Sequence, residues 1–105
     1  MPDKFENVSV VKKANVFFDG KCVSHSVLFP DGTRKTLGVI MPGSHLVFNV
    51  NAPELMEITE GECEVKIAGE PAAKVYTPGT SFRVAANGSF EIHARSLVNY
   101  VCSFG

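Results

Sequence analysis

Residues 63–67, Cys63-Glu64-Val65-Lys66-Ile67, alternate apolar and charged side chains one by one. Successive side chains of a β-strand point to opposite faces, so such a segment buries one face and exposes the other. No part of the chain carries a sustained apolar repeat of about 3.6 residues, the period of an amphipathic helix. The stretch therefore predicts a half-buried strand in an all-β protein.

Two further segments repeat this pattern near the C-terminus. Residues 90–95 alternate Phe, Ile and Ala with Glu, His and Arg, and alternate residues of 98–104 are apolar. Turn residues separate the segments, as in Pro30-Asp31-Gly32-Thr33, where Pro fixes φ and Gly tolerates a positive φ. Many short strands must close on themselves or pack as two sheets, because an open sheet exposes an apolar face and two edges. We predict a small β-barrel.

Length and composition fit a single domain over residues 1–105. A chain of 105 residues, 45% of them hydrophobic, can bury one continuous core. Within it we expect residues 1–16 to form an N-terminal strand at an edge. The turn-poor segment 8–18 should pair with another edge or with another subunit, and on that ground we expect a homodimer.

Charge, hydropathy and cysteine usage indicate the cellular setting. Ten basic residues are scattered among eleven acidic ones, whereas nucleic-acid binders cluster positive charge. No apolar run approaches the roughly 18 residues of a membrane-spanning helix. Cys22, Cys63 and Cys102 form neither a complete disulfide set nor a Cys-x-x-Cys pair, so we expect reduced thiols packed in a core. We expect a cytoplasmic protein without nucleic-acid or membrane partners.

Residues 42–50 followed by 54–61, and residues 78–84 followed by 87–90, resemble the two cupin motifs. In that superfamily a His-x-His pair precedes a Glu that stands seven positions before a Gly, and a later strand supplies a third His. Glu54 and Gly61 match the middle element. The resemblance implies a cupin-like β-barrel of the jelly-roll type.

The histidine positions of these motifs are not occupied by histidine. They fall near Phe48, Val50 and Phe90, whose side chains have no atoms that bind a metal. A transition metal needs three or four convergent N, O or S ligands, which one carboxylate cannot replace. The histidines of the chain are isolated from one another in the sequence: His25, His45 and His93. We expect no metal.

Glu54 shares its strand parity with Met56 and Ile58, so its carboxylate is expected to point toward the interior. A buried carboxylate requires a cation, hydrogen-bond donors or a ligand, and such groups gather at functional sites. The alternative is a strand-start residue beside Pro53 with its carboxylate in solvent. The sequence leaves both interpretations open.

Five short patterns in fixed order narrow the resemblance to one family. Residues 18–21, 38–43, 54–61, 79–84 and 100–102 are similar to patterns of the small cupin-like pyrimidine/purine nucleoside phosphorylases, and the resemblance covers residues 17–104. It implies a pentosyltransferase, a type of glycosyltransferase, that uses inorganic phosphate to cleave the N-glycosidic bond of varied nucleosides. The products are a free base and pentose 1-phosphate, and no cofactor is required.

Such a reaction needs an anion site. We expect Arg34 to be catalytic and to bind phosphate, since its planar guanidinium suits phosphate oxygens, with help from Ser24, Thr36 and Lys21. This depends on the hairpin around residues 30–33. Pairing of like parity places Ser24, Ser26, Arg34 and Thr36 on one face, whereas a shift of one residue turns the two serines away.

The sugar and the base need further contacts. Glu54 is the second catalytic candidate, because a fixed carboxylate can hold ribose hydroxyls and stabilise positive charge on the sugar. Aromatic rings can stack on any base, and amide or hydroxyl groups can bond to it. The nucleoside-binding candidates are Phe48, Phe82, Asn87, Ser89 and Phe90. The same aromatic residues can instead form the barrel core.

Two other interpretations share these features. One is a metal-free cupin that binds a small sugar-like or nucleoside-like ligand without catalysis. The other is a structural protein whose barrel is simply filled by side chains.

Overall fold

A computed structural model describes residues 3–105, so the first two residues of the expected edge segment lie outside it. Short antiparallel strands make up the fold, with one 3-10 turn, η1 (Phe18–Gly20). The strands are β1 (Ser9–Val10), β2 (Asn15–Phe17), β3 (Cys22–Leu28), β4 (Arg34–Ile40), β5 (His45–Asn49), β6 (Glu54–Glu60), β7 (Cys63–Ile67), β8 (Lys74–Tyr76), β9 (Ser81–Val84), β10 (Ser89–Ala94) and β11 (Val98–Phe104).

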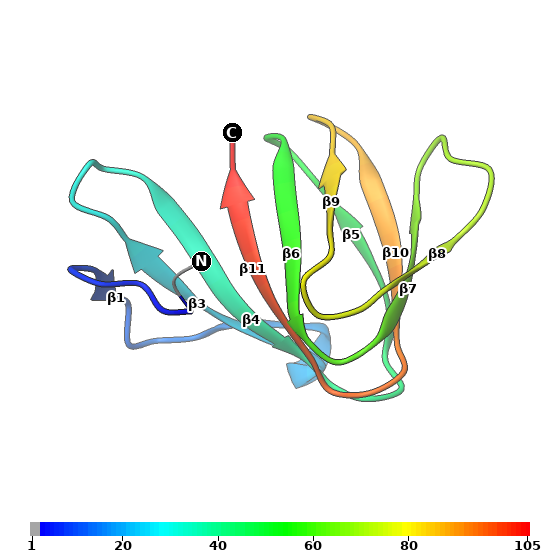
Figure 1. The fold of residues 1–105 in the computed structure, drawn as a ribbon, viewed down its shortest axis with the longest axis horizontal. Helices are drawn as coiled ribbons and strands as arrows, with labels where there is room; N and C mark the ends of the chain where they lie inside the picture. The colour runs from blue at the N-terminus through cyan, green and yellow to red at the C-terminus, as the bar shows by residue number, and fades with distance from the viewer. Residues whose placement is uncertain (1–2) are drawn as a thin grey trace.

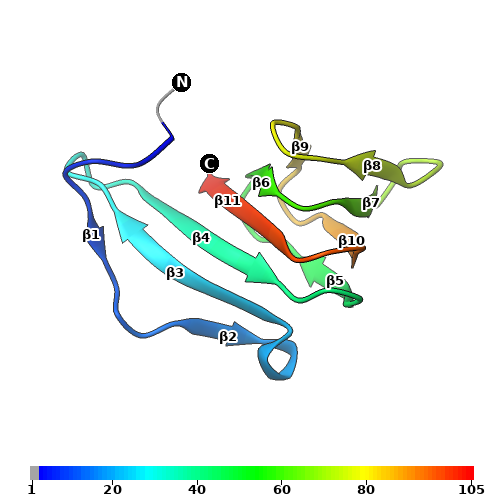
Figure 2. The same cartoon turned by 60° about the horizontal axis from the view of Figure 1, so that its bottom comes forward.

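The strands form two sheets that pack on each other (Figures 1 and 2). A seven-stranded sheet has the order β1-β3-β4-β11-β6-β9, with β2 also pairing to β3, and a four-stranded sheet has the order β5-β10-β7-β8. From β4 onward the chain passes repeatedly from one sheet to the other, so the two sheets form a single folding unit. The predicted all-β, jelly-roll type barrel is confirmed.

The inner faces of the two sheets form the core, as the alternation predicts. In β7, Cys63 and Val65 are buried while Lys66 is exposed, and in β10 the Phe, Ile and Ala side chains are buried while Glu and His are exposed. Burying a large aliphatic side chain contributes about 1.5–3 kcal/mol, so this two-sided pattern fixes which face of each strand turns inward.

The N-terminal segment pairs with an edge of the same chain. Strand β1 pairs with the end of β3, placing Val10 opposite Val27, and β2 pairs with the start of β3. Phe5 packs edge-to-face on Phe29, with ring centroids 5.1 Å apart, and Val27 is buried on this outer side of the sheet. Of the two expectations for residues 8–18, the intramolecular edge is the one realised here.

The turn between β3 and β4 sets the register of the hairpin. Gly32 adopts a φ of 88°, and the Asp31 carboxylate accepts hydrogen bonds from the backbone N–H and the hydroxyl of Thr33. Ser26 then lies opposite Thr36, and Leu28 lies opposite Arg34. This is pairing of like parity, so Ser24, Ser26, Arg34 and Thr36 share one face of the sheet.

Strand β11 approaches β4 closely at one point. Tyr100 lies opposite Gly38, and a Cβ added at Gly38 would stand 2.1 Å from the ring of Tyr100. The missing side chain therefore lets the tyrosine ring lie flat against β4.

We expect Gly38→Ala to lower the free energy of unfolding by about 1–3 kcal/mol, because the added methyl overpacks a buried contact. Chemical denaturation measures the change. The control is the same substitution in a Tyr100→Val background, where the ring is gone and the cost should shrink. An equal cost in both backgrounds would show that the ring is not the cause.

Candidate functional site

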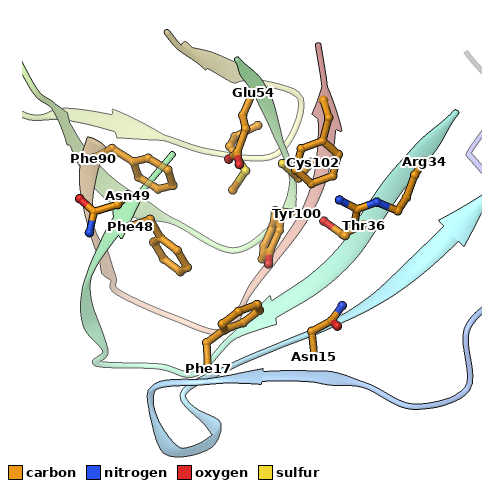
Figure 3. Close-up of a pocket in the computed structure, with 12 residues that line it drawn as sticks. Asn15, Phe17, Arg34, Thr36, Phe48, Asn49, Glu54, Phe90, Tyr100 and Cys102 are labelled. Carbon is orange, nitrogen blue, oxygen red and sulfur yellow. The ribbon is translucent and has the colours of Figure 1, made fainter. Parts of the chain in front are cut away.

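A cavity of about 320 Å³ lies between the sheets, within the size range of small-molecule sites. Its walls combine side chains from β2, β4, β5, β6, β10 and β11 (Figure 3). The lining residues are Asn15, Phe17, Arg34, Thr36, Phe48, Asn49, Glu54, Met56, Phe90, Tyr100, Cys102 and Phe104.

The cavity has two chemically different ends. Arg34, Thr36 and Asn15 form a polar end, and Phe48 and Phe90 form an aromatic end. Figure 3 shows Glu54 and Tyr100 between them. Such a cavity suits a ligand that is anionic at one end and flat and apolar at the other.

Arg34 begins β4 and keeps its donors available. Its guanidinium lies over the ring of Phe104, 4.4 Å from the centroid, a cation–π contact that orients the group. Within residues 3–105 it makes no ion pair and no side-chain hydrogen bond. An oriented guanidinium without a carboxylate partner suits an incoming anion.

Glu54 begins β6 and is half-buried on the face that carries Met56 and Ile58. Burial raises the pKa of its carboxyl, and the neighbouring Cys102 thiol and the charge of Arg34 oppose that rise. Its lining position supports the inward interpretation over a carboxylate in bulk solvent. Glu54 and Arg34 face the same space without forming an ion pair.

Two groups of β11 lie beside these charges and stay neutral. Burial raises the pKa of the Cys102 thiol to about 12, with the Glu54 carboxylate adding to the effect. Burial also raises the pKa of the Tyr100 phenol, whose oxygen lies 3.5 Å from Cys22 Sγ. Cys102 is thus an unreactive thiol, and Tyr100 is a neutral hydrogen-bonding group at the cavity wall.

Asn15 reaches the polar end from the edge strand β2. Its Nδ2 donates to Ser24 Oγ at 3.3 Å and to Ser26 Oγ at 3.4 Å. Ser24 is almost completely buried and does not line the cavity. Ser24 was expected to contact phosphate directly. In the structure it instead holds the side chain of Asn15, and the amide of Asn15 lines the cavity.

The structure brings together five of the ten residues singled out from the sequence. Arg34, Thr36, Glu54, Phe48 and Phe90 line the cavity. The other five lie outside it: Lys21, Ser24, Phe82, Asn87 and Ser89.

Each of these placements has a local reason. Lys21 follows η1 and is exposed. Phe82 packs in the core between Tyr76 and Phe90, with centroids 4.9 and 5.3 Å away. Asn87 occupies a turn at a φ of 61°, where its backbone N–H bonds to Asn51, and Ser89 follows that turn.

Seven lining residues were not singled out from the sequence. Tyr100, Cys102 and Phe104 share the inward parity of β11, and Met56 shares that of Glu54, so alternation could have found them. Asn15 and Phe17 depend on how β2 pairs, and Asn49 on the end of β5, for which the sequence carried no signal.

Where the cupin motifs carry histidine, Phe48 and Phe90 stack with centroids 5.2 Å apart and planes 18° apart. His45 and His93 stack instead on the outer face of the small sheet, where His45 Nε2 lies 3.0 Å from a Glu91 carboxylate oxygen. In the part of the chain that the structure describes, no three His, Cys, Asp or Glu side chains converge as a metal site, and no helix is long and apolar enough to cross a bilayer.

The sequence is similar to one family of proteins over nearly its whole length. Residues 12–104 match the family model described as pyrimidine/purine nucleoside phosphorylase. A protein of that name from Cupriavidus pinatubonensis is 59% identical over 97% of this chain and 96% of its own length.

Solved structures agree on the fold. A crystal structure of a protein of unknown function from Acinetobacter sp. ADP1 superposes with a TM-score of 0.94 at 47% identity, covering 97% of this chain and 98% of that one. An RmlC-like cupin from Shewanella frigidimarina superposes at 0.71 with 18% identity over 94% of this chain and 84% of its own. The predicted cupin-like barrel is confirmed.

The raised pKa of Glu54 predicts a pH-dependent stability difference. Its carboxyl has a higher pKa in the folded than in the unfolded chain, so the folded state is penalised above both values and not below them. We expect Glu54→Gln, which is neutral at every pH, to be more stable than the wild type at pH 7. The difference should shrink as the pH falls through the pKa of Glu54.

Urea denaturation at pH 7 and at acidic pH measures this. Glu57→Gln, on the same strand but on the opposite face, is the matched control and should give a smaller change. A Glu54→Gln variant that is less stable at pH 7 would show that the carboxylate stabilises the fold.

Proposed function

Because the chain belongs to the pyrimidine/purine nucleoside phosphorylase family, we propose that its cavity is where inorganic phosphate cleaves the N-glycosidic bond of a nucleoside. In this pentosyl transfer a phosphate oxygen forms a bond to C1′ of the sugar as the bond from C1′ to the base nitrogen breaks. The base leaves with that electron pair and takes up a proton. The products are the free base and pentose 1-phosphate.

The observation that carries the assignment is the order of groups along one cavity. A nucleoside undergoing phosphorolysis presents, in sequence, the attacking anion, the pentose and the planar base. The polar end (Arg34, Thr36, Asn15), the carboxylate of Glu54 and the aromatic end (Phe48, Phe90) follow the same order (Figure 3). One orientation of the substrate therefore satisfies all three regions.

Phosphate is assigned to the polar end. Arg34 offers guanidinium donors, Thr36 a hydroxyl and Asn15 an amide that its own serine contacts hold in place. Charge-assisted hydrogen bonds from arginine to an oxyanion are about twice as strong as neutral ones. Arg34 thus holds the nucleophile, and its neutral neighbours complete the site.

The sugar is assigned to the space beside Glu54. The carboxylate can accept hydrogen bonds from ribose hydroxyls, and its negative charge stabilises the positive charge that develops on an oxocarbenium-like sugar. Its half-buried position strengthens that interaction, because water screens it less. Binding of phosphate at Arg34 also brings the two reactants into line.

The base is assigned to the aromatic end. The ring of Phe48, backed by the buried ring of Phe90, presents hydrocarbon that can contact the face of a base and does not read its hydrogen-bonding edge. Contact of this type accepts purines and pyrimidines alike. This supports a broad range of nucleoside substrates.

We also propose that the enzyme is a cytoplasmic homodimer. Support for a second copy comes from apolar side chains on the outer face of the large sheet, where Val16 and Leu37 are 63% and 41% exposed. Support for the compartment comes from the three free, buried cysteines, Cys22, Cys63 and Cys102. Reduced thiols of this kind are typical of the cytosol.

The direct test of the proposed function is incubation of the purified protein with uridine or adenosine, with and without inorganic phosphate. We expect free base and pentose 1-phosphate to appear only when phosphate is present, as measured by chromatography. Saturable binding of nucleoside without release of base would instead indicate a binding protein, and neither binding nor release would indicate a structural one.

Arg34→Ala should raise the KM for phosphate by about ten- to a hundredfold, because it removes the charged donors of the anion site. It should change thermal stability little, since Arg34 is exposed. Arg83→Ala is the matched control, because Arg83 is an exposed arginine outside the main cavity. Equal phosphate KM values in Arg34→Ala and the wild type would remove Arg34 from the site.

Glu54→Gln is expected to reduce kcat by at least about tenfold while the protein stays folded, because the neutral amide cannot stabilise positive charge on the sugar. Steady-state kinetics at saturating phosphate and nucleoside measure kcat. A fully active variant would restrict Glu54 to a structural role.

A further inference from the structure

Phe17 and Phe18 are adjacent aromatic residues at the N-terminal edge, and the proposed function gives neither of them a role. Phe17, the last residue of β2, is 45% exposed, and Phe18, the first residue of η1, is 42% exposed. Phe17 also lines the cavity itself, as Figure 3 shows. An exposed aromatic ring at the wall of a ligand cavity is surface that a ligand can cover.

The register of β2 directs Phe17 toward the cavity. Phe17 lies opposite Cys22, which is fully buried on the inner face of β3, and Asn15 lies opposite Ser24 on that same face. Val16, between them, lies opposite Val23 and points to the outer side. Phe17 and Val16 are therefore neighbouring residues with opposite orientations.

The chain beyond Phe17 is held in an unusual conformation. Phe18, Asp19 and Gly20 have φ values of 54°, 55° and 88°, so three consecutive residues are left-handed. A bulky residue seldom adopts this conformation, and where it does the surroundings must hold it there. For Phe18 the holding contact is Phe48, whose ring meets it edge-to-face with centroids 5.2 Å apart.

This contact ties the edge segment to the aromatic end of the cavity. Phe48 stacks on Phe90, so one set of touching rings runs from Phe18 to the barrel core. The two side chains are about equally exposed, but Phe17 lines the cavity, whereas Phe18 packs on Phe48 and does not line it. Phe18 is thus an anchor, and Phe17 is the free contact surface.

We propose that Phe17 is a base-stacking residue that closes the cavity over the nucleobase, and that Phe18 positions it by packing on Phe48. The inference rests on the proposed phosphorolysis and adds the element that sets affinity for the base. Stacking on Phe17 reads the size of the π-face, so it favours purines over pyrimidines without excluding either. It makes no demand on the phosphate end.

The reverse reaction separates base contacts from all others, because its substrates are a free base and ribose 1-phosphate. We expect Phe17→Ala to raise the KM for the base by roughly five- to a hundredfold, the range that loss of one aromatic stack produces. The increase should be larger for adenine than for uracil. The KM for ribose 1-phosphate, which has no base, should stay within about twofold of the wild type.

Val16→Ala is the matched control, since it truncates the adjacent exposed side chain on the other side of the strand. It should leave both KM values unchanged. Phe18→Gly is the second variant: glycine adopts the left-handed conformation freely, so the backbone is preserved while the anchor to Phe48 is lost. It should raise the base KM in the same direction as Phe17→Ala.

Three results would overturn the inference. They are an unchanged base KM in Phe17→Ala, an equal rise in both KM values, or a changed oligomeric state with unchanged kinetics, which would make Phe17 a subunit contact. These outcomes require an active wild-type enzyme. A wild type that releases no base from nucleosides in the presence of phosphate would instead reject the proposed function itself, and the role of Phe17 with it.

Discussion

The site depends on the register of β11 between its two neighbours. Tyr100 lies opposite Gly38 of β4, Cys102 lies between Thr36 and Met56, and Phe104 lies opposite Glu54 of β6. All of these residues except Gly38 line the cavity. A slip of one residue would turn the inner side chains of β11 outward and remove Tyr100, Cys102 and Phe104 from the cavity wall.

This register also keeps the two charged groups of the cavity apart. Arg34 enters from β4 and Glu54 from β6, with β11 between them. Phe104 occupies the face of the guanidinium and so orients it without neutralising it. A direct ion pair would satisfy both groups in the empty protein and oppose binding of phosphate and sugar. The half-buried, incompletely compensated carboxylate costs stability, a common feature of functional sites.

The sequence was most informative where one physical rule decides the outcome. Alternation predicted the buried faces of β7, β10 and β11, because burial of apolar side chains fixes strand orientation. The same rule predicted an inward side chain for Glu54. It left a solvent-exposed carboxylate as an alternative, because a residue at the start of a strand can direct its carboxylate into solvent. The register around Arg34 depends on turn geometry, which the Pro-Asp-Gly-Thr pattern allows but does not fix. Asn15 and Phe17 escaped notice because β2 is a three-residue edge strand whose pairing partner leaves no local pattern.

Aromatic side chains stand at the positions where the cupin motifs carry histidine, and they change what the barrel can recognise. An imidazole cluster binds a metal ion, whereas the ring of Phe48, stacked on the buried ring of Phe90, offers an apolar surface. Such a surface suits a planar base, and the polar end across the cavity suits an anion. Stabilisation of charge is then left to Glu54 and Arg34, which belong to different strands of one sheet. The barrel positions the groups, and the identity of a few inward side chains decides the chemistry they perform.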